Sequence, residues 1–329
     1  MSNSRVVIGS SFYLNVGRSD PGVRRNYLQQ TKLWAQAVRR AGYPFFLEIK
    51  HLGLIDAERM AELRDITDTF TLHLQYLSRP GKAYNTLNMV DPADRGAIKG
   101  DVQIANAFSQ LRPKLVSVHC GFSAVEIGTA PPDDHNFAVT RVLSRSETAT
   151  GIKDTLNIAA GCFAGMEYRS PILIENLDYR PGDPGLGMGG AYEHVCEPDF
   201  IFEVLRGNPN VCSLLDVAHG IIAAANLHVK YKINDLAAKL YESGALYQLH
   251  LNAPKRDDGG MLDMHLPFYK DTEVVQTLLT VMRLHKANVS RETPLFITIE
   301  PKVSDCETDP FNTVYLQGME LLKLLRSSY

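Results

Sequence analysis

The chain has no uninterrupted apolar run of about 18 residues, the length that a helix needs to cross a membrane. Residues 1–5 lead into a short strand-like run, and no apolar signal core precedes it. The composition, 45% hydrophobic and 22% charged, is that of a soluble globular protein. These absences argue against a membrane or exported protein, and we expect a cytoplasmic one.

Cysteine is scarce, and neither sign of charge is in clear excess. The five cysteines include no CxxC pair, and their odd number in a long chain argues against a disulfide framework. The net charge is −3, so no global positive field marks the chain for nucleic acid, although a local basic patch stays possible. We expect free thiols and no general attraction to DNA or RNA.

Several catalytic signatures are also missing. The chain has no GxSxG nucleophile elbow and no Walker A phosphate loop. Residues 185–190 match GxGxxG, but they lie in a Pro/Gly-rich segment and do not open a helix directly after a strand. The pattern therefore gives no support to dinucleotide binding, and we interpret this segment as a flexible lid.

What the chain does contain is a regular alternation of short apolar runs and amphipathic segments. The predicted strands are residues 5–9, 43–49, 69–74, 114–119, 171–176, 211–216, 245–251 and 295–300. The predicted helices are residues 24–40, 56–63, 100–111, 153–165, 199–205, helical material from 217 to about 241, 271–285 and 311–325. Strands that are apolar on both faces and alternate with helices are typical of a parallel sheet covered by helices.

Eight such units allow the sheet to close, so we predict a single α/β domain over residues 1–329, a (β/α)8 TIM barrel. No Ser/Gly linker, charge block or low-complexity tract divides the chain. Two long βα loops stand out, at about residues 121–150 and 177–198. Both leave the carboxyl ends of strands, the face on which such barrels place their sites.

The carboxyl ends of strands three to eight carry imidazole or carboxylate side chains, and three more follow closely in the chain, the last two of them in the predicted loop after the seventh strand. The nine candidate metal ligands are His73, His119, Glu175, Asp216, His219, His250, Asp263, His265 and Glu300. Zinc, iron and manganese all prefer these ligand types. Closure of a barrel would turn the strand ends toward one cavity.

Taken singly, each residue has a simpler explanation. A strand-end histidine is more often a packing residue, and an Asp after a strand can cap the next helix. As a set they favour a polynuclear metal site, because five of the ten histidines fall in it and nine ligands exceed the needs of one ion. We expect the other histidines, including His285, to lie in solvent. We take His73, Glu175, Asp216 and His250 as the catalytic members.

In this order, the nine residues resemble the xylose-isomerase-like superfamily of barrels, over about residues 69–302. The members with a three-metal site are endonuclease IV and the multinuclear non-haem iron-dependent oxidases (MNIO, the methanobactin-synthase-like group). The specific motifs are residues 216–219 (DVAH), the spacing from His250 to Asp263-x-His265, residues 174–176 (IEN) and residues 299–300 (IE).

The resemblance implies how the ligands are shared. It assigns His73, His119 and Glu175 to one ion. It makes Glu175 a bridge to a second ion held by Asp216, His250 and Glu300. It gives a third ion to His219, Asp263 and His265.

Two relatives compete for the function. The segment from Glu175 to Tyr179, residues 196–202 and residues 214–226 look more like the oxidases. The pattern His73-x-x-Tyr76, and Asn252 in a His-Leu-Asn run, look more like endonuclease IV. We favour the oxidases.

Resemblance to the oxidases implies two or three iron ions (Fe2+/Fe3+) and use of O2 to modify a cysteine of a ribosomally synthesised precursor peptide. It also implies delivery of that peptide by a small partner protein. Because His/Asp/Glu sets also accept Zn2+ or Mn2+, one alternative is an endonuclease IV-like trinuclear zinc phosphodiesterase acting on abasic DNA. A sugar isomerase-like enzyme using only Glu175, Asp216, His250 and Glu300 and a metal-dependent peptide-binding scaffold are further alternatives.

Overall fold

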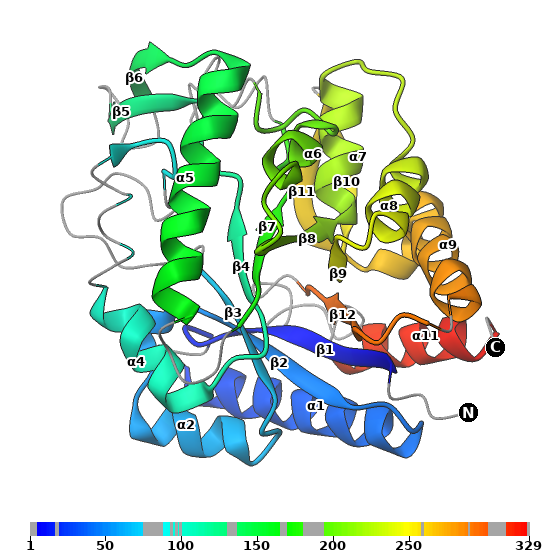
Figure 1. The fold of residues 1–329 in the computed structure, drawn as a ribbon. Helices are drawn as coiled ribbons and strands as arrows, with labels where there is room; N and C mark the ends of the chain where they lie inside the picture. The colour runs from blue at the N-terminus through cyan, green and yellow to red at the C-terminus, as the bar shows by residue number, and fades with distance from the viewer. Residues whose placement is uncertain are drawn as a thin grey trace.

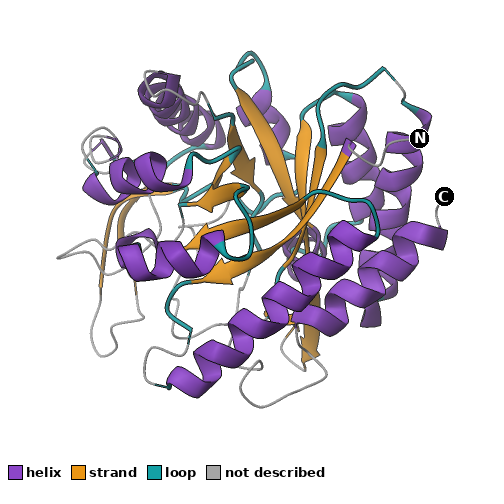
Figure 2. Ribbon diagram, turned by 90° about the horizontal axis from the view of Figure 1, so that it is seen from below, coloured by secondary structure: helices purple, strands orange, loops and turns teal. Residues whose placement is uncertain are grey.

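Eight parallel strands close into a barrel, in the order β1-β12-β9-β8-β7-β4-β3-β2 (Figure 1). We describe it from a computed structural model. The structure describes residues 5–16, 20–74, 88–92, 95, 98, 101–129, 137–164, 170–179, 194–257, 260–288, 290–301 and 314–327. Viewed from below, helices surround the strands (Figure 2). The predicted (β/α)8 barrel is confirmed.

Each predicted strand and helix has a counterpart. The barrel strands are β1 (Val6–Tyr13), β2 (Phe45–Lys50), β3 (Phe70–His73), β4 (Val116–His119), β7 (Ile172–Glu175), β8 (Val211–Asp216), β9 (Leu246–Leu251) and β12 (Leu295–Ile299). The α-helices are α1 (Pro21–Arg40), α2 (Ala57–Arg64), α4 (Val102–Leu111), α5 (Arg145–Ala164), α6 (Phe200–Leu205), α7 (Val217–Asn226), α8 (Ile233–Glu242), α9 (Thr272–Ala287) and α11 (Val314–Ser327). Two 3₁₀ turns, Leu52–Leu54 and Phe268–Lys270, complete the helical elements of the described residues.

Aspartate side chains fix where several helices begin. The carboxylate of Asp20 accepts hydrogen bonds from the backbone N–H groups of Gly22 and Val23 at the start of α1, where Pro21 needs no partner for its nitrogen. Asp56, Asp101 and Asp271 cap α2, α4 and α9 in the same way. Local sequence therefore sets the position of these helices outside the barrel.

The barrel interior changes from apolar to polar along the strands. Near the amino-terminal ends, one layer is formed by Val7, Phe46, Leu115, Leu173, Leu214 and Phe296. The rings of Phe46 and Phe296 pack edge to face with centroids 5.0 Å apart. Successive inward positions are two residues apart, so the next layers toward the carboxyl ends contain the polar residues. The barrel is sealed at one end and lined with polar groups at the other.

Two antiparallel hairpins leave the carboxyl-terminal face. The first pairs β5 (Ala124–Thr129) with β6 (Phe137–Val142), and the second pairs β10 (Ala253–Asp257) with β11 (Gly260–Leu266). We had expected loops in both places, and α5 begins eight residues before its predicted start at 153 because the segment after β6 is already helical. Most of the other long loop, including the Gly-rich residues 185–190, lies outside the described residues.

One expected exposure is wrong. His285 is 3% exposed: its Nδ1 lies 3.0 Å from the Tyr241 hydroxyl and its Nε2 lies 3.1 Å from the carbonyl oxygen of Arg5. Its position on the inner face of α9 explains the burial. Among the helices of the described residues, none is long and apolar enough to span a bilayer.

The contact of α11 with α1 gives a stability test. A Cβ on Gly318 would lie 2.3 Å from the indole ring of Trp34, which is fully buried. We expect Gly318→Ala to lower the free energy of unfolding by about 1–3 kcal/mol, because two helices must move apart. Gly161→Ala is the matched control: its Cβ would meet nothing within 4 Å, so it should stabilise α5 by roughly 0.5–1 kcal/mol. Chemical denaturation would measure both, and equal effects of the two changes would contradict this packing.

Candidate metal centre

The structure brings the nine predicted ligands together at the carboxyl ends of the barrel strands. Strand register aligns His119 with Glu175 and Asp216 with His250. Seven of the ligand side chains come from β3, β4, β7, β8, α7, β9 and the residue after β12, and β11 carries the other two. The side chains at the barrel centre are almost completely buried, among them Asp216 and His250 at 0% exposure.

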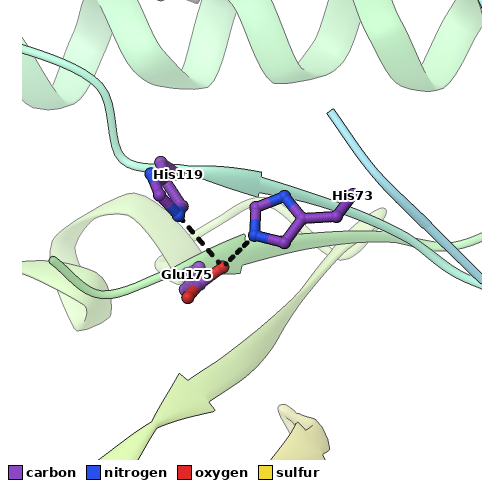
Figure 3. A group of neighbouring side chains, drawn as sticks. All are labelled: His73, His119 and Glu175. Atoms are coloured by element: carbon purple, nitrogen blue, oxygen red, sulfur yellow. Dashed lines mark ion pairs between the residues drawn. The ribbon is translucent and has the colours of Figure 1, made fainter. Parts of the chain in front are cut away.

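His73, His119 and Glu175 form the first group (Figure 3). The Nε2 atoms of His73 and His119 lie 3.0 and 3.5 Å from Oε2 of Glu175. Neither ring nitrogen of His73, nor this oxygen, makes a hydrogen bond of acceptable geometry within the described part of the chain. Buried polar atoms that converge without hydrogen bonding are what a cation site provides.

His250 joins the first group to a second. Its Nδ1 is 3.5 Å from Oε1 of Glu175, 3.2 Å from Oε2 of Glu300 and 3.8 Å from Oδ2 of Asp216. Asn252 donates hydrogen bonds to the same oxygens of Asp216 and Glu300. Glu175 therefore has one oxygen facing each group, the position that a bridging carboxylate would need.

The third group lies between α7 and β11. Oδ2 of Asp263 is 2.9 Å from Nε2 of His265 and 3.6 Å from Nε2 of His219. Nδ1 of His219 lies 3.0 Å from the carbonyl oxygen of Asn176, and Nδ1 of His265 lies 3.3 Å from that of Glu300. If each Nδ1–H donates to its carbonyl, both Nε2 lone pairs point toward Asp263.

The grouping of donors is less separate than the resemblance implies. His219 also comes close to Glu175 and Asp216, and one donor atom from each of the three lies within 4.8 Å of the others. His265 adopts a left-handed backbone with φ of 46°, an uncommon conformation for a residue other than glycine. The pairing of β10 with β11 is irregular between Ala253 and Lys255, opposite Leu262 to Leu266, and this bulge carries the Asp263 and His265 side chains that reach the site.

Asp216 serves two structures with its two oxygens. Oδ1 accepts a hydrogen bond from the backbone N–H of His219 and so caps α7, while Oδ2 faces His250. The side chain of Asn176 holds this strand end, donating to the carbonyl oxygen of Asp216 at 2.9 Å and accepting from its N–H at 2.8 Å. The capping and metal-ligand interpretations of Asp216 are therefore compatible.

The pKa values show how strongly these charges interact. Against the opposing effect of burial, His119, His73 and His250 hold the pKa of Glu175 well below its usual range. Burial lowers the pKa of His119 to about 3 and, with help from the carboxylates of Glu300 and Glu175, raises that of Asp216 to about 7. Although burial opposes it, the Asp263 carboxylate raises the pKa of His265 to about 9. A cation that binds beside His265 must therefore displace a proton from its ring, whereas the His119 ring is already neutral near pH 7.

The donor set fits divalent metal ions. Imidazole nitrogens and carboxylate oxygens converge at a buried site, and several of them make no hydrogen bond to another described residue that would occupy their lone pairs. These clusters could hold metal ions, and they offer nitrogen and oxygen donors without a cysteine thiolate.

Sequence reasoning missed two buried charged residues on β2. Glu48 and Lys50 are 0% and 2% exposed and lie beside His250 and Glu300. The signal was present, because charged residues two apart in an otherwise apolar parallel strand must share one face. The predicted ligands lie at the ends of strands three to eight or just beyond them, and strand two was left out.

No protein-family model and no curated protein matches the chain. Among solved structures, a family 2 AP endonuclease from Brucella melitensis is 16% identical, with a TM-score of 0.51 over 88% of this chain and 91% of that one. The TTHB071 protein from Thermus thermophilus, soaked with zinc chloride, is 13% identical, with a TM-score of 0.53 over 98% of both chains. At these identities the likeness shows the barrel fold alone.

The hairpin that carries Asp263 and His265 depends on Asn226 at the end of α7. The Asn226 side chain donates to the carbonyl oxygen of Met261 and accepts from its N–H, each at 2.9 Å. We expect Asn226→Ala to weaken metal binding by about 10–100-fold, because two ligands lose their fixed position. The metal content that remains after incubation with increasing concentrations of a chelator would measure this loss of affinity. Asn106→Ala, on the exposed face of α4, is the control; equal retention in both variants would refute the role of Asn226.

Proposed function

We propose that the chain is a multinuclear iron-dependent oxidase that uses O2 to modify a cysteine of a ribosomally synthesised precursor peptide. The observation that carries the proposal is the position of Glu175, whose two oxygens face different groups of imidazoles. Such a carboxylate can hold two ions close together and offset their mutual repulsion. The segment from Glu175 to Tyr179, residues 196–202 and residues 214–226, which resemble the oxidases more than endonuclease IV, support this choice.

The residues of the chain would supply position and charge. His73 and His119 would hold an ion on one side of Glu175, and Asp216, His250 and Glu300 an ion on the other. Iron, when bound, would supply the one-electron steps that O2 chemistry requires. The peptide, and a small partner protein to deliver it, are part of the proposal.

A second candidate has its own support. A trinuclear zinc phosphodiesterase would use the same ligands to activate water and to stabilise a leaving oxygen. The similar solved structures include an AP endonuclease and a protein soaked with zinc chloride. The net charge of −3 gives no help to a DNA-binding function, so we rank this candidate second.

Elemental analysis of anaerobically purified protein separates the two candidates. We expect two or three iron ions per chain, and O2 uptake when a cysteine-containing precursor peptide is added together with its partner protein. The same peptide with serine in place of cysteine is the control. A protein that contains only zinc, takes up no O2 and nicks a duplex with an abasic site would replace the oxidase with the hydrolase.

Glu175 should matter to every ion it touches. We expect Glu175→Gln to reduce metal affinity by more than the roughly 10–100-fold typical of losing an outer contact, because a shared ligand is removed. Metal content after dialysis would measure the loss. Glu203→Gln, a change on α6 that breaks a contact with Arg145, is the matched control. Unchanged metal content in Glu175→Gln would contradict the bridging position.

A further inference from the structure

Strand β2 places two opposite charges inside the barrel although neither residue is among the predicted ligands. Glu48 and Lys50 are two positions apart and both point inward, and their side chains are almost completely buried. Buried charges are rare unless they are paired or bind a metal. Their partners therefore indicate what they do.

Both carboxylate oxygens of Glu48 contact other side chains inside the barrel. Its Oε2 lies 3.0 Å from Nε2 of His250 and accepts a hydrogen bond from Gln248 at 2.6 Å. Its Oε1 accepts a hydrogen bond from the Ser11 hydroxyl at 2.9 Å. Because both oxygens are engaged, Glu48 is poorly placed to be a ligand, although it lies within 4.8 Å of donor atoms of His250 and Glu300.

The position of Glu48 decides which nitrogen of His250 can bind a cation. A neutral imidazole carries one N–H and one lone pair. With Nε2–H donated to Glu48, the lone pair is on Nδ1, the atom surrounded by carboxylate oxygens of Glu175, Asp216 and Glu300. A carboxylate on the far nitrogen also makes the ring a stronger donor.

Lys50 acts on Glu300 in a corresponding way. Its ammonium group forms an ion pair with Oε1 of Glu300 and lies 5.2 Å from the centre of the Tyr13 ring. The Ser11 hydroxyl is 3.5 Å from the same oxygen. The other oxygen, Oε2, is the one that faces Nδ1 of His250. Glu48 thus contacts Nε2 of His250, and Lys50 contacts Oε1 of Glu300. The other atom of each pair, Nδ1 of His250 and Oε2 of Glu300, is left facing the cavity.

We propose that β2 is the orienting strand of the metal centre, in which Glu48 fixes His250 and Lys50 fixes Glu300 toward the same ion. Both are positioning residues and neither is a ligand. The inference rests on the part of the proposed function that places metal at His250 and Glu300, and it holds for iron and for zinc alike.

The test uses the full-length protein loaded with Co2+. The paramagnetic ion shifts the N–H proton of a bound imidazole out of the main NMR spectrum, and this signal disappears in D2O. The shifted signal that disappears in the His250→Gln variant is assigned to His250. We expect Glu48→Ala to lose or broaden this signal and to bind Co2+ about 10–100-fold more weakly. Glu48→Gln, whose amide oxygen can still accept the hydrogen bond, should restore the signal in part.

Lys50→Met is the matched variant on the same strand. It should also weaken Co2+ binding, by about 10–100-fold, but keep the His250 signal, because the ion pair of Lys50 is with Glu300 and Nε2 of His250 still faces Glu48. Loss of the signal in both variants would mean general loosening of the strand and would overturn the proposal. Wild-type affinity and an intact signal in Glu48→Ala would overturn it as well.

The same experiment separates this inference from the proposed function. Wild-type protein that takes up no Co2+ would refute the metal centre, and with it both proposals. Wild-type protein that binds Co2+ while Glu48→Ala behaves identically would refute only the orienting role. If Glu48 were itself a ligand of the ion beside His250, Glu48→Gln would lose an equivalent of Co2+ and the shifted His250 signal with it, which would overturn the orienting role.

Discussion

The burial of ionisable side chains at the centre of the barrel is the constraint on which the rest of the structure depends. Glu175 and Asp216 are withdrawn from solvent, and so are His73 and His250. Carboxylates in such a place are costly unless positive charge lies close by. In the chain alone, protonated imidazoles such as that of His265 supply it, and bound metal ions would supply it more completely. Hydrogen bonds from Asn176 and Asn226, and the contacts of Glu48 and Lys50 on β2, keep these groups close together. The barrel therefore holds several carboxylates in one buried site, together with the imidazoles that lie beside them.

The fold and the membership of the site were accessible from sequence for one geometric reason. Parallel strands in a closed barrel bring their carboxyl ends to one face, so His73, Glu175 and Glu300, far apart in the chain, had to meet. The sharing of ligands was not accessible, because it depends on side-chain rotamers and on which ring nitrogen carries hydrogen. The hairpin carrying His265 was missed because a short polar strand after a barrel strand resembles a loop. Glu48 was missed because the predicted ligands came only from strands three to eight and the segments just beyond them, although Glu48 lies near the end of strand two.

The barrel itself leaves the reaction open. Solved structures with a similar fold include an AP endonuclease, yet at 16% identity the shared property is the frame. Oxidase and hydrolase would both use the carboxylates and imidazoles of this cavity. What would differ is the ion bound. The affinity and reactivity of that ion would be tuned by the groups behind its ligands, such as the Glu48 carboxylate behind His250 and the Lys50 ammonium behind Glu300. Contacts behind the ligands therefore matter as much as the ligands in deciding the chemistry.

The two oxygens of Asp216 also link local folding to the site. One oxygen ends β8 by starting α7, and the other faces the cavity. His219, in the first turn of that helix, donates the capping hydrogen bond from its backbone N–H, so the cap also positions this residue. The helix start and this corner of the metal centre are consequently one cooperative unit. An ion bound there would act as a disulfide cross-link does in other proteins, because it would connect α7, the end of β8 and the hairpin of β10 and β11.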